Sequence, residues 1–556
     1  MAVIEETRAV KAPEPIGLPP ALRPFRHRMF AALWVGSLLA NFGVWVHQVG
    51  AAWLMLSLAV GADEVALIQT ATAMPMLLLS LIAGAAADLW DRRIAFLAGQ
   101  SVVALSAACL ALLGLFEMVT PLVLLGLTFA LSSGATWRQP AYQASVGELV
   151  PRGEIAAAVA LNSINFNLAR SLGPALGGFI IIGFGAVGTF AFNAVANLFV
   201  IAILLFWRRR MVKDDLPRER LLPAMGAGLR YVRGSPGILV AVLRAGLFGL
   251  TGSALWALLP LSADGLPDGG PLTYGLLLGA LGMGAVLGAV TIGELRRRLR
   301  NEGVILLGHV LFGAASLALA LIGQLWPLLL FLLFGGLAWM IILSTFNVTV
   351  QLTAAEWVKA RALSIYFTGL FGGMSLGSWL WGEMAERLSL EWAMAAAGIA
   401  TLAVGVIGNF LRLPTNLARD LTVPLAIDDG SPLRPPGVDS ETGFVAVTVS
   451  YHVDPAKADA FLTVMRRLRR LRRRDGALRW TLYQDIDEPT RWVEAFVLAS
   501  WLDHLRHMRR TTVGDRKVLE AIAHFHQGDG PPKVTHLIAR GFPNVGWPPG
   551  RATAAM

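Results

Sequence analysis

The chain has 556 residues, of which 55% are hydrophobic and only 15% are charged, whereas about a quarter of the residues of an ordinary soluble domain are charged. The charges are unevenly placed, since 47 of residues 1–411 but 37 of the 145 residues that follow are Asp, Glu, Lys or Arg. This pattern excludes a soluble, fibrous or disordered protein and predicts a membrane part followed by a water-soluble part. The single cysteine, Cys109, excludes a disulfide framework.

Residues 1–28 are rich in proline and lack the apolar core and cleavage site of a signal peptide, so they are predicted to be a cytoplasmic tail. A membrane-spanning helix needs about 20 mostly apolar residues. Twelve such stretches follow: 29–58, 64–87, 94–116, 121–148, 155–182, 184–206, 237–262, 273–294, 303–323, 326–352, 361–386 and 391–411. They predict an all-α membrane part with a first bundle of six helices, 29–206, a polar loop, 207–236, and a second bundle, 237–411.

Basic residues gather in alternate connections between these stretches. They are Arg23, Arg26, Arg28, Arg92, Arg93, Arg152, Arg208, Arg209, Arg210, Arg296, Arg297, Arg298, Lys359, Arg361 and Arg412. The other connections carry Asp63, Glu64, Glu117, Asp264, Asp268 and Glu391, with Arg387 as the main exception. Because Lys and Arg accumulate in cytoplasmic loops, both termini and the loop 207–236 are predicted to be cytoplasmic. The lipid bilayer thus explains much of the positive charge, and nucleic acid is not an expected partner.

The two predicted bundles repeat each other. Gly84, Arg92, Arg93, Gly173 and Gly178 recur 204 residues later as Gly288, Arg296, Arg297, Gly377 and Gly382. A duplicated six-helix unit is typical of carriers in which two halves rock about a central binding site.

Two segments have a composition typical of regions that change their packing during transport. The first runs from Gly84 to Arg93 and places Asp88 before the basic pair Arg92 and Arg93. Asp88 at a helix end is suited to hold one packing of the helices and then release it; a basic cluster that only sets topology is the alternative. The second segment includes Gly173, Pro174, Gly177 and Gly178, which predict a kink and a flat helix surface, or ordinary close packing of small residues.

Together these segments resemble the signatures of the major facilitator superfamily, with departures at Leu89 and Asp91. More closely, the chain resembles the transmembrane secretion effector branch, which includes enterobactin and macrolide exporters. The stretches that carry the likeness are 41–53, 137–178, 256–260 and 347–382. The resemblance implies a multi-pass protein of the bacterial cytoplasmic membrane that exports a small molecule by ion exchange, without a cofactor.

Ionisable and polar residues inside the spans are the candidates for binding substrate or protons, because a charge in a span is costly and by default functional. The candidates are Arg138, Arg170, Arg244, His47, Gln48 and Glu383. Arg138 matches an arginine of the superfamily's fourth helix and is the first choice. Trp34, Trp45, Trp53, Trp137 and Trp256 are candidate stacking walls or interfacial belts. Structural ion pairs are the alternative for each charged residue.

The energy source is predicted from absences in the sequence. The first span has no Asp or Glu where many antiporters of the superfamily have one, so the proton site of those antiporters does not transfer to this chain. No phosphate-binding loop ending in Lys-Ser or Lys-Thr is present, which argues against ATP as the direct driver. Proton antiport remains the expected source of energy.

A linker, 412–442, leads to a water-soluble domain, 443–540, and a final tail, 541–556. Strands are predicted at 444–451, 478–484, 492–499 and 533–539, with helices from about 454 to 474 and from 501 to 526. This order is that of a ferredoxin-like α+β domain, and it resembles antibiotic-biosynthesis monooxygenases, which implies dimerisation through the domain. Neither catalysis nor its absence follows from these residues.

Two features of this domain have open interpretations. Seven arginines between Arg466 and Arg474 lie on a helix whose apolar face includes Phe461, Met465 and Leu468, so they face either solvent or anionic lipid. His504 and His507 lie three apart on one helix face and are interpreted as structural rather than as metal ligands. No metal site is expected.

The leading hypothesis is a secondary exporter of a siderophore-, macrolide- or drug-like small molecule. The alternatives are a membrane-tethered monooxygenase-like enzyme and a ligand sensor that acts through the C-terminal domain.

Overall fold

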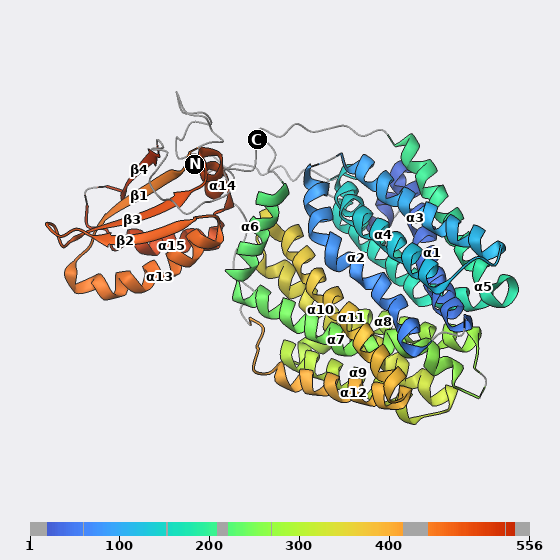
Figure 1. Cartoon of the computed structure of the whole chain (residues 1–556). Coiled ribbons are helices and arrows are strands. Elements are labelled where there is room, and N and C mark those ends of the chain that lie inside the picture. The colour runs from blue at the N-terminus through green and yellow to red at the C-terminus, as the bar shows by residue number, and fades with distance from the viewer. Residues whose placement is uncertain are drawn as a thin grey trace, which may run out of the picture. The chain divides into compact units, whose positions relative to one another are not determined.

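Helices make up nearly all of the described chain before Phe410 (Figure 1). The computed structural model describes residues 19–58, 61–89, 91–151, 154–207, 221–267, 269–414, 443–528 and 530–539. After a short 3-10 helix, η1 (Pro20–Arg26), the first half contains α1 (Arg28–Ser57), α2 (Ala62–Leu89), α3 (Arg92–Leu115), α4 (Pro121–Leu149) and α5 (Ile155–Phe206). Next come α6 (Leu221–Arg233) and the second half, α7 (Pro236–Asp264), α8 (Pro271–Arg298), α9 (Asn301–Leu321), α10 (Leu325–Thr353), η3 (Glu356–Val358), α11 (Lys359–Arg387) and α12 (Leu390–Ile407).

Helix α5 consists of two helices that meet at a kink. Gly185 there has φ +67° and ψ −175°, a conformation that glycine adopts far more readily than other residues. The fifth and sixth predicted spans therefore join at Gly185 without a loop. With the two parts of α5 counted separately, the described residues form twelve long helices before Phe410, besides the shorter α6.

Nine helices in the described parts of the chain are long and apolar enough to cross a membrane, with α5 counted once. Helices α4 and α11 have the length but a more polar composition. The chain is therefore a mainly helical membrane protein. A polar helix in a bundle is expected where it contributes to a site rather than to the lipid-facing surface.

Helix α3 illustrates how these helices pack. Its large apolar residues Leu105, Leu112 and Leu115 are exposed, whereas small residues such as Gly99 and Ala107 are buried. This is the reverse of a soluble protein, because lipid tails are as apolar as leucine and helix association in a membrane depends on close van der Waals contact.

The chain forms two compact units. The first comprises residues 1–218, 245–344 and 367–410, and the second comprises residues 219–244, 345–366 and 411–556. The second unit thus contains α6, the adjoining ends of α7, α10 and α11, and the C-terminal domain. The sequence predicts a loop over 207–236, but its described part contains the helix α6, whose buried face includes Tyr231 and Val232.

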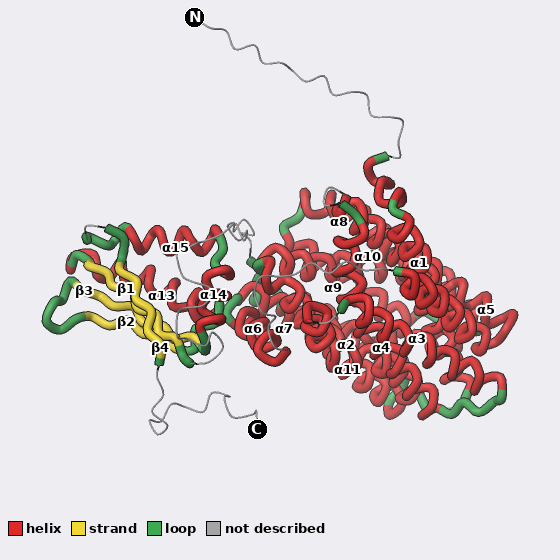
Figure 2. Tube along the Cα trace, turned by 90° about the horizontal axis from the view of Figure 1, so that it is seen from above, coloured by secondary structure: helices red, strands yellow, loops and turns green. Residues whose placement is uncertain are grey.

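The C-terminal domain is a four-stranded antiparallel sheet with helices on one face (Figure 2). Its elements are β1 (Val445–His452), η4 (Pro455–Lys457), α13 (Ala458–Arg474), β2 (Arg479–Gln484), β3 (Arg491–Leu498), α14 (Trp501–Arg510), α15 (Val513–Ala523) and β4 (Lys533–Ile538). The strands lie in the order β2-β3-β1-β4. Alternate residues of β1 and β3 are buried under the helices, with Val449 opposite Glu494.

One predicted helix of this domain is wrong. The sequence predicts a single helix over 501–526, but α14 ends at Arg510 and α15 begins after Thr512. Thr512 and Asp515 form a reciprocal capping box, in which each side chain accepts a hydrogen bond from the backbone N–H of the other. Such a cap satisfies N–H groups that a helix start leaves unpaired, so it favours a new helix over a continuous one.

Several predicted features lie outside the described residues. They are residues 1–18 of the N-terminal tail, most of the linker 412–442, the tail 541–556, and the charged residues Arg152, Arg208, Arg209, Arg210 and Asp268. The side chains of Asp88 and Glu356 are likewise outside the description.

Candidate functional site

Glycines bring the two halves of the membrane part into close contact along α5 and α8. A Cβ atom built on Gly178 would lie 3.0 Å from the carbonyl oxygen of Pro271, and one built on Gly275 would lie 3.1 Å from that of Pro174. Larger residues at either glycine would have to push the backbones apart. The Gly-Pro segment therefore forms a seam between the halves.

The same segment also contacts α1. A Cβ atom on Gly173 would lie 2.6 Å from the Cβ of Trp45, and one on Gly177 would lie 3.0 Å from the Cβ of Val49. One face of α5 thus packs on α1 of its own half, while Gly178 faces α8 of the other half.

A second seam between the halves runs along α2 and α11. Ser80 and Thr368 are joined by a hydrogen bond of 2.8 Å between their hydroxyl oxygens, and Thr70 donates to the carbonyl of Ser375 at 3.2 Å. At the start of α2, the backbone N–H of Ala62 donates to Glu386 at 2.8 Å. Gly382, the repeat partner of Gly178, also lies on this seam, since its Cβ would be 2.5 Å from that of Ala66.

An arginine lies between aromatic rings from both halves. The guanidinium carbon of Arg170 on α5 is 6.0 Å from the ring centre of Trp45 on α1 and 5.8 Å from that of Trp256 on α7. The ring centres of Trp45 and Trp256 are 6.4 Å apart, and the ring centre of Trp339 on α10 is 5.3 Å from that of Trp256. We call these four residues the Arg170 cluster.

The Arg170 cluster lies deep in the membrane part. Arg170 is midway between Ile155 and the kink at Gly185, and Trp339 is midway along α10. Arg170 is only 9% exposed, and in the described residues its Nε has no hydrogen-bond partner and no acid forms an ion pair with it. A cation over tryptophan faces gains a favourable cation–π interaction, but its remaining donors suit an anionic ligand.

A polar stripe on α1 leads to this cluster. Trp34, Ser37, Asn41, Trp45 and Gln48 recur every three or four residues, which places them on one helix face. Asn41 donates to Asn165 at 2.8 Å, Ser37 and Tyr142 share a hydrogen bond of 3.1 Å, and Gln48 donates to Gln69 at 3.3 Å. The stripe therefore continues into α2, α4 and α5 as a network of neutral polar groups.

The other buried candidates lie around this network. Arg138 of α4 is 7% exposed and stands one turn before Tyr142, and its Nε has no hydrogen-bond partner in the described residues. His47 packs its ring 4.9 Å from that of Phe190, and neither of its nitrogens has a partner in the same residues. His47 is adjacent to Gln48 in sequence but lies outside the regular spacing of the polar stripe.

The remaining two candidates have partners of their own. Glu383 forms an ion pair with Arg387 one turn further along α11 and is partly exposed. Arg244 donates to the carbonyl of Leu411 at 3.1 Å and lies 5.5 Å from the ring centre of Phe346. These contacts do not bring either residue to the Arg170 cluster.

The segment from Gly84 to Arg93 connects three helix ends. Asp91 caps α3 by accepting from the backbone N–H of Arg93 at 2.8 Å. Arg92 forms a 2.9 Å ion pair with Glu148 of α4, and Arg93 donates to the carbonyls of Leu204 and Leu205 at the end of α5. Gly84 is buried in α2, and the side chain of Asp88 is outside the description. The basic pair thus links the ends of α3, α4 and α5.

The sequence indicates Arg170, Trp45 and Trp256 as candidates, but it does not indicate Trp339, Asn41, Asn165 or Tyr142. The spacing of polar residues along α1 contains the signal for Asn41. Trp339, by contrast, is one aromatic residue in a long apolar stretch, and only the packing of α7 on α10 gives it significance.

Buried charges also occur in the C-terminal domain. Glu494 of β3 is fully buried and accepts from Arg472 at 3.1 Å, from Trp480 at 2.9 Å and from Tyr451 at 3.2 Å. Burial, followed by the Glu494 charge, raises the pKa of the Tyr451 phenol. All three donors point to one carboxylate, so this group holds β1, β2, β3 and α13 together.

His507 is held in its neutral form beside this group. Its Nε2 accepts from Arg472 at 3.3 Å and its Nδ1 lies 3.3 Å from the carbonyl of Asp475. Burial, and next the charge of Arg472, holds the pKa of His507 well below its usual value. These contacts engage both ring nitrogens. In the described residues no group of three or more His, Cys, Asp or Glu side chains is placed to hold a metal ion.

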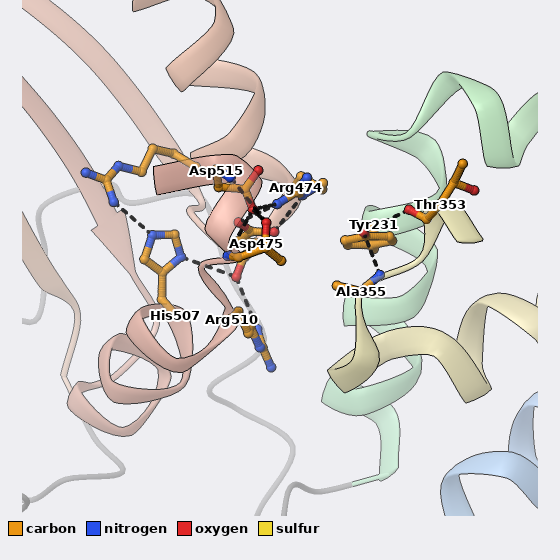
Figure 3. Close-up of polar contacts among 10 residues, drawn as sticks. Tyr231, Thr353, Ala355, Arg474, Asp475, His507, Arg510 and Asp515 are labelled. Atoms are coloured by element: carbon orange, nitrogen blue, oxygen red, sulfur yellow. Dashed lines mark hydrogen bonds and ion pairs between the residues drawn. The ribbon is translucent and has the colours of Figure 1, made fainter. Parts of the chain in front are cut away.

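Within the second unit, Tyr231 of α6 joins the C-terminal domain to the α10–α11 connection (Figure 3). Its hydroxyl accepts a hydrogen bond from the backbone N–H of Ala355 at 3.0 Å. The guanidinium carbon of Arg474 lies 5.0 Å from the centre of the Tyr231 ring. Arg510 similarly lies 4.4 Å from the ring centre of Trp357. We call these five residues the Tyr231 junction.

One arginine of the junction, Arg474, is itself buried among acids. Arg474 donates to Asp475 at 2.7 and 2.9 Å and to Asp515 at 2.7 Å. Although burial lowers the pKa of Arg474, the charges of Asp475 and Asp515 outweigh it and raise that pKa. Arg474 is therefore a fixed cation on the ring of Tyr231.

Solved structures show the fold of the membrane part. The POT family transporter PepTSo is similar with a TM-score of 0.59 and 11% identity, over 69% of this chain and 97% of that chain. The nucleoside transporter NupG is similar with a TM-score of 0.57 and 13% identity, over 69% of this chain and 99% of that chain. These likenesses show that the membrane part has the fold of these two transporters.

Curated relatives are similar over most of their own length. The multidrug efflux pump Tap of Mycolicibacterium fortuitum is 26% identical over 398 residues, which is 69% of this chain and 94% of that protein. The enterobactin exporter EntS of Escherichia coli O1:K1 / APEC is 27% identical over 355 residues, 62% of this chain and 82% of that protein. The staphyloferrin A transporter of Staphylococcus aureus is 22% identical over 381 residues, 68% of this chain and 94% of that protein.

The family model described as transmembrane secretion effector matches residues 20–542. The match extends through the C-terminal domain as well as the membrane helices. The chain is therefore a member of the transmembrane secretion effector family of major facilitator transporters.

Proposed function

We propose that the protein exports a small organic anion from the cytoplasm by alternating access, with its binding site at the Arg170 cluster. The observation that carries this proposal is the position of Arg170 between Trp45 and Trp256, which belong to different halves. A ligand held there contacts both halves, so its binding responds to their relative tilt. The guanidinium supports an anionic group, and the tryptophan faces support an aromatic or other flat apolar body.

The two seams support the rocking motion. Helices α5 and α8 meet through glycines on both sides, which leaves few side chains to interlock. Helices α2 and α11 meet through hydroxyl groups and backbone carbonyls, whose hydrogen bonds are short-range and exchangeable. We propose that the Arg92 and Arg93 contacts hold the first half rigid during this motion, and that Asp88 acts as the releasable latch.

The names of the similar proteins support a proposal about the class of compound that is transported. Their names describe a multidrug efflux pump, an enterobactin exporter and a staphyloferrin A transporter. An acidic, siderophore-like compound fits the Arg170 cluster better than a cationic drug, because a cation would meet a buried guanidinium. Arg138 lies beside the same polar network and would serve as a second contact for a larger anion.

We propose proton antiport as the energy source, with His47 and Glu383 as the candidate proton carriers. One proton moving inward releases about 2.3 kcal/mol per 100 mV of membrane potential. The proposed orientation, with both termini in the cytoplasm, follows the alternation of basic connections.

The test is transport in proteoliposomes energised first by a pH step and then by a potential. Aromatic anions and cations matched in size serve as probes, and metabolite profiles of a deletion strain then identify the cargo. Export of anions, driven by the pH step and strongly reduced in Arg170→Ala at cargo concentrations near the KM of the unchanged protein, is the expected result. Preference for cations, or equal transport by Arg170→Ala, contradicts the proposed site.

For the C-terminal domain we propose a ferredoxin-like fold that pairs with a second copy through its open sheet face. The strand order supports the fold, and Tyr483 and Leu537 supply exposed apolar side chains on the face away from the helices. A monooxygenase-like activity has less support, because Tyr451 and Arg472 both donate hydrogen bonds to the buried carboxylate of Glu494. Turnover or ligand binding by residues 443–540 expressed alone would favour the enzyme or sensor alternatives.

A further inference from the structure

The structure divides the seven arginines of α13 into two sets. Arg472 and Arg474 are engaged with Glu494, Asp475 and Asp515. The other five are exposed, and in the described residues none of them forms an ion pair with an acid; they are Arg466, Arg467, Arg469, Arg470 and Arg473. We call these five the arginine face.

An unneutralised cluster of this kind is costly for a folded domain unless it has a partner. Like charges on one helix repel at (i, i+3) and (i, i+4) spacing, as Arg466 does with Arg469 and Arg470. Their long side chains have three rotatable methylene groups and present planar forks of N–H donors, which suit phosphate oxygens. The arginine face therefore predicts a phosphate-bearing partner.

An apolar hollow borders the same face. A cavity of about 350 Å³ lies between α13 and the strands β2 and β3. Arg466 and Arg469 lie at this cavity together with Thr481, and the remaining lining is apolar: Leu462, Met465, Trp480, Leu482 and Trp492. A ligand that fills it has both an anionic group and an apolar part.

The connection of α13 to membrane helices favours a lipid among the ligands with an anionic group and an apolar part. Its last residue, Arg474, lies on Tyr231 of α6, within the unit that also holds the start of α7 and the end of α10. Arg466 is eight residues earlier, or about 12 Å along the helix axis. The arginine face is thus tethered to helices that enter the bilayer, whose anionic headgroups attract arginines at about 1 kcal/mol each near the surface.

We propose that the arginine face and the adjoining Trp480–Trp492 cavity bind an anionic phospholipid of the membrane in which the chain resides. The phosphate lies among the guanidinium groups of Arg466, Arg469 and Arg470, and the glycerol and first acyl carbons enter the cavity. This role does not depend on which compound the protein transports.

The test uses the full chain in nanodiscs of phosphatidylcholine alone or with about a third phosphatidylglycerol. Amide hydrogen exchange of residues 458–474 is measured in both. A fluorophore at Thr463→Cys, in the Cys109→Ala background, gives a second readout, because Thr463 is exposed on α13 and Cys109 is the chain's single cysteine.

Phosphatidylglycerol is expected to slow amide exchange in α13 at least tenfold and to shift the emission of the fluorophore to shorter wavelength. Arg466→Gln/Arg469→Gln/Arg470→Gln should abolish both effects. The matched control is Arg509→Gln/Arg516→Gln/Lys517→Gln, which removes three exposed charges from α14 and α15 and should leave both effects intact.

Four outcomes would overturn the proposal. Equal exchange in the two kinds of nanodisc would show that α13 does not contact lipid. If the control variant Arg509→Gln/Arg516→Gln/Lys517→Gln also lost the phosphatidylglycerol effect, the effect would come from the net charge of the domain rather than from the arginine face. Protection by inorganic phosphate in phosphatidylcholine discs would indicate a site for free phosphate. Protection by an added RNA or acidic peptide, without a response to phosphatidylglycerol, would indicate a macromolecular partner.

Discussion

Arg170 is the residue on which the proposed transport site depends most directly. Arg170→Ala removes the cation between Trp45 and Trp256, and a charge-assisted contact of this kind contributes about 1.5–3 kcal/mol. The apparent KM for an anionic cargo is therefore expected to rise about 10- to 100-fold in proteoliposome assays, while the amount of inserted protein stays the same. Arg170→Lys keeps the charge but loses the planar fork, so an intermediate KM is expected. A purely structural arginine would give reduced insertion and an unchanged KM.

His507 gives the C-terminal domain a specific dependence on pH. Its pKa is held well below 6.5 in the folded chain, whereas an unfolded histidine titrates near 6.5. Above pH 6.5 both states are neutral, and as the pH falls below 6.5 only the unfolded state gains the proton. The free energy of unfolding should thus decrease on acidification by up to about 1.4 kcal/mol per pH unit.

The measurement is amide exchange of α14 in the full chain at pH 7.5 and 5.5, corrected for intrinsic rates. His507→Gln removes the imidazole that takes up this proton in the unfolded state, so the pH dependence of exchange should become weaker. If the two proteins respond to pH alike, another group is responsible.

The close packing of α5 on α8 can be tested by placing a larger side chain at the seam between these two helices. Gly178→Leu places a branched side chain where even a Cβ atom would be 3.0 Å from the Pro271 carbonyl, so the halves cannot pack as they do. Turnover is expected to fall at least tenfold with a smaller change in cargo binding. Gly183→Leu is the matched control on the same helix, because no atom lies within 4 Å of its Cβ position. An equal loss in both variants would exclude a seam-specific effect.

The Tyr231 junction offers a second test of packing between elements. Arg474→Ala leaves Asp475 and Asp515 buried without their cation, which costs about 3–5 kcal/mol. Faster amide exchange is expected in α13, α15 and residues 353–361 of the α10–α11 connection. Arg509→Ala, which removes an exposed arginine of α14 outside the arginine face, should leave exchange unchanged. Faster exchange confined to α13 and α15 would show that the junction does not stabilise the connection.

For the whole molecule, twelve spans and the alternating basic connections predict that both termini lie in the cytoplasm. Small tags at residues 1 and 556 should then react with a membrane-impermeant reagent only in inverted vesicles. A cysteine at Glu117, in the Cys109→Ala background, should react in intact cells and provides the control for sidedness. Termini on opposite faces would require an odd number of spans and a different assignment of the halves.

The sequence alone determined that the chain is a helical membrane protein with a small α+β domain, because apolar length, charge density and strand periodicity are local properties. It also indicated Arg170, Trp45 and Trp256 as separate candidates. The sequence prediction of one helix over 501–526 was wrong at the break between α14 and α15, where the four-residue capping box from Thr512 to Asp515 starts a new helix.

Which residues act together depends on how the helices and strands pack. Trp339 gained meaning from its contact with Trp256, the glycines of α5 from their approach to α8, and the arginines of α13 from the burial of two and the exposure of five. Each of these depends on distances between residues far apart in the chain. Such distances are set by how helices and strands pack, and no local pattern of residue types contains them.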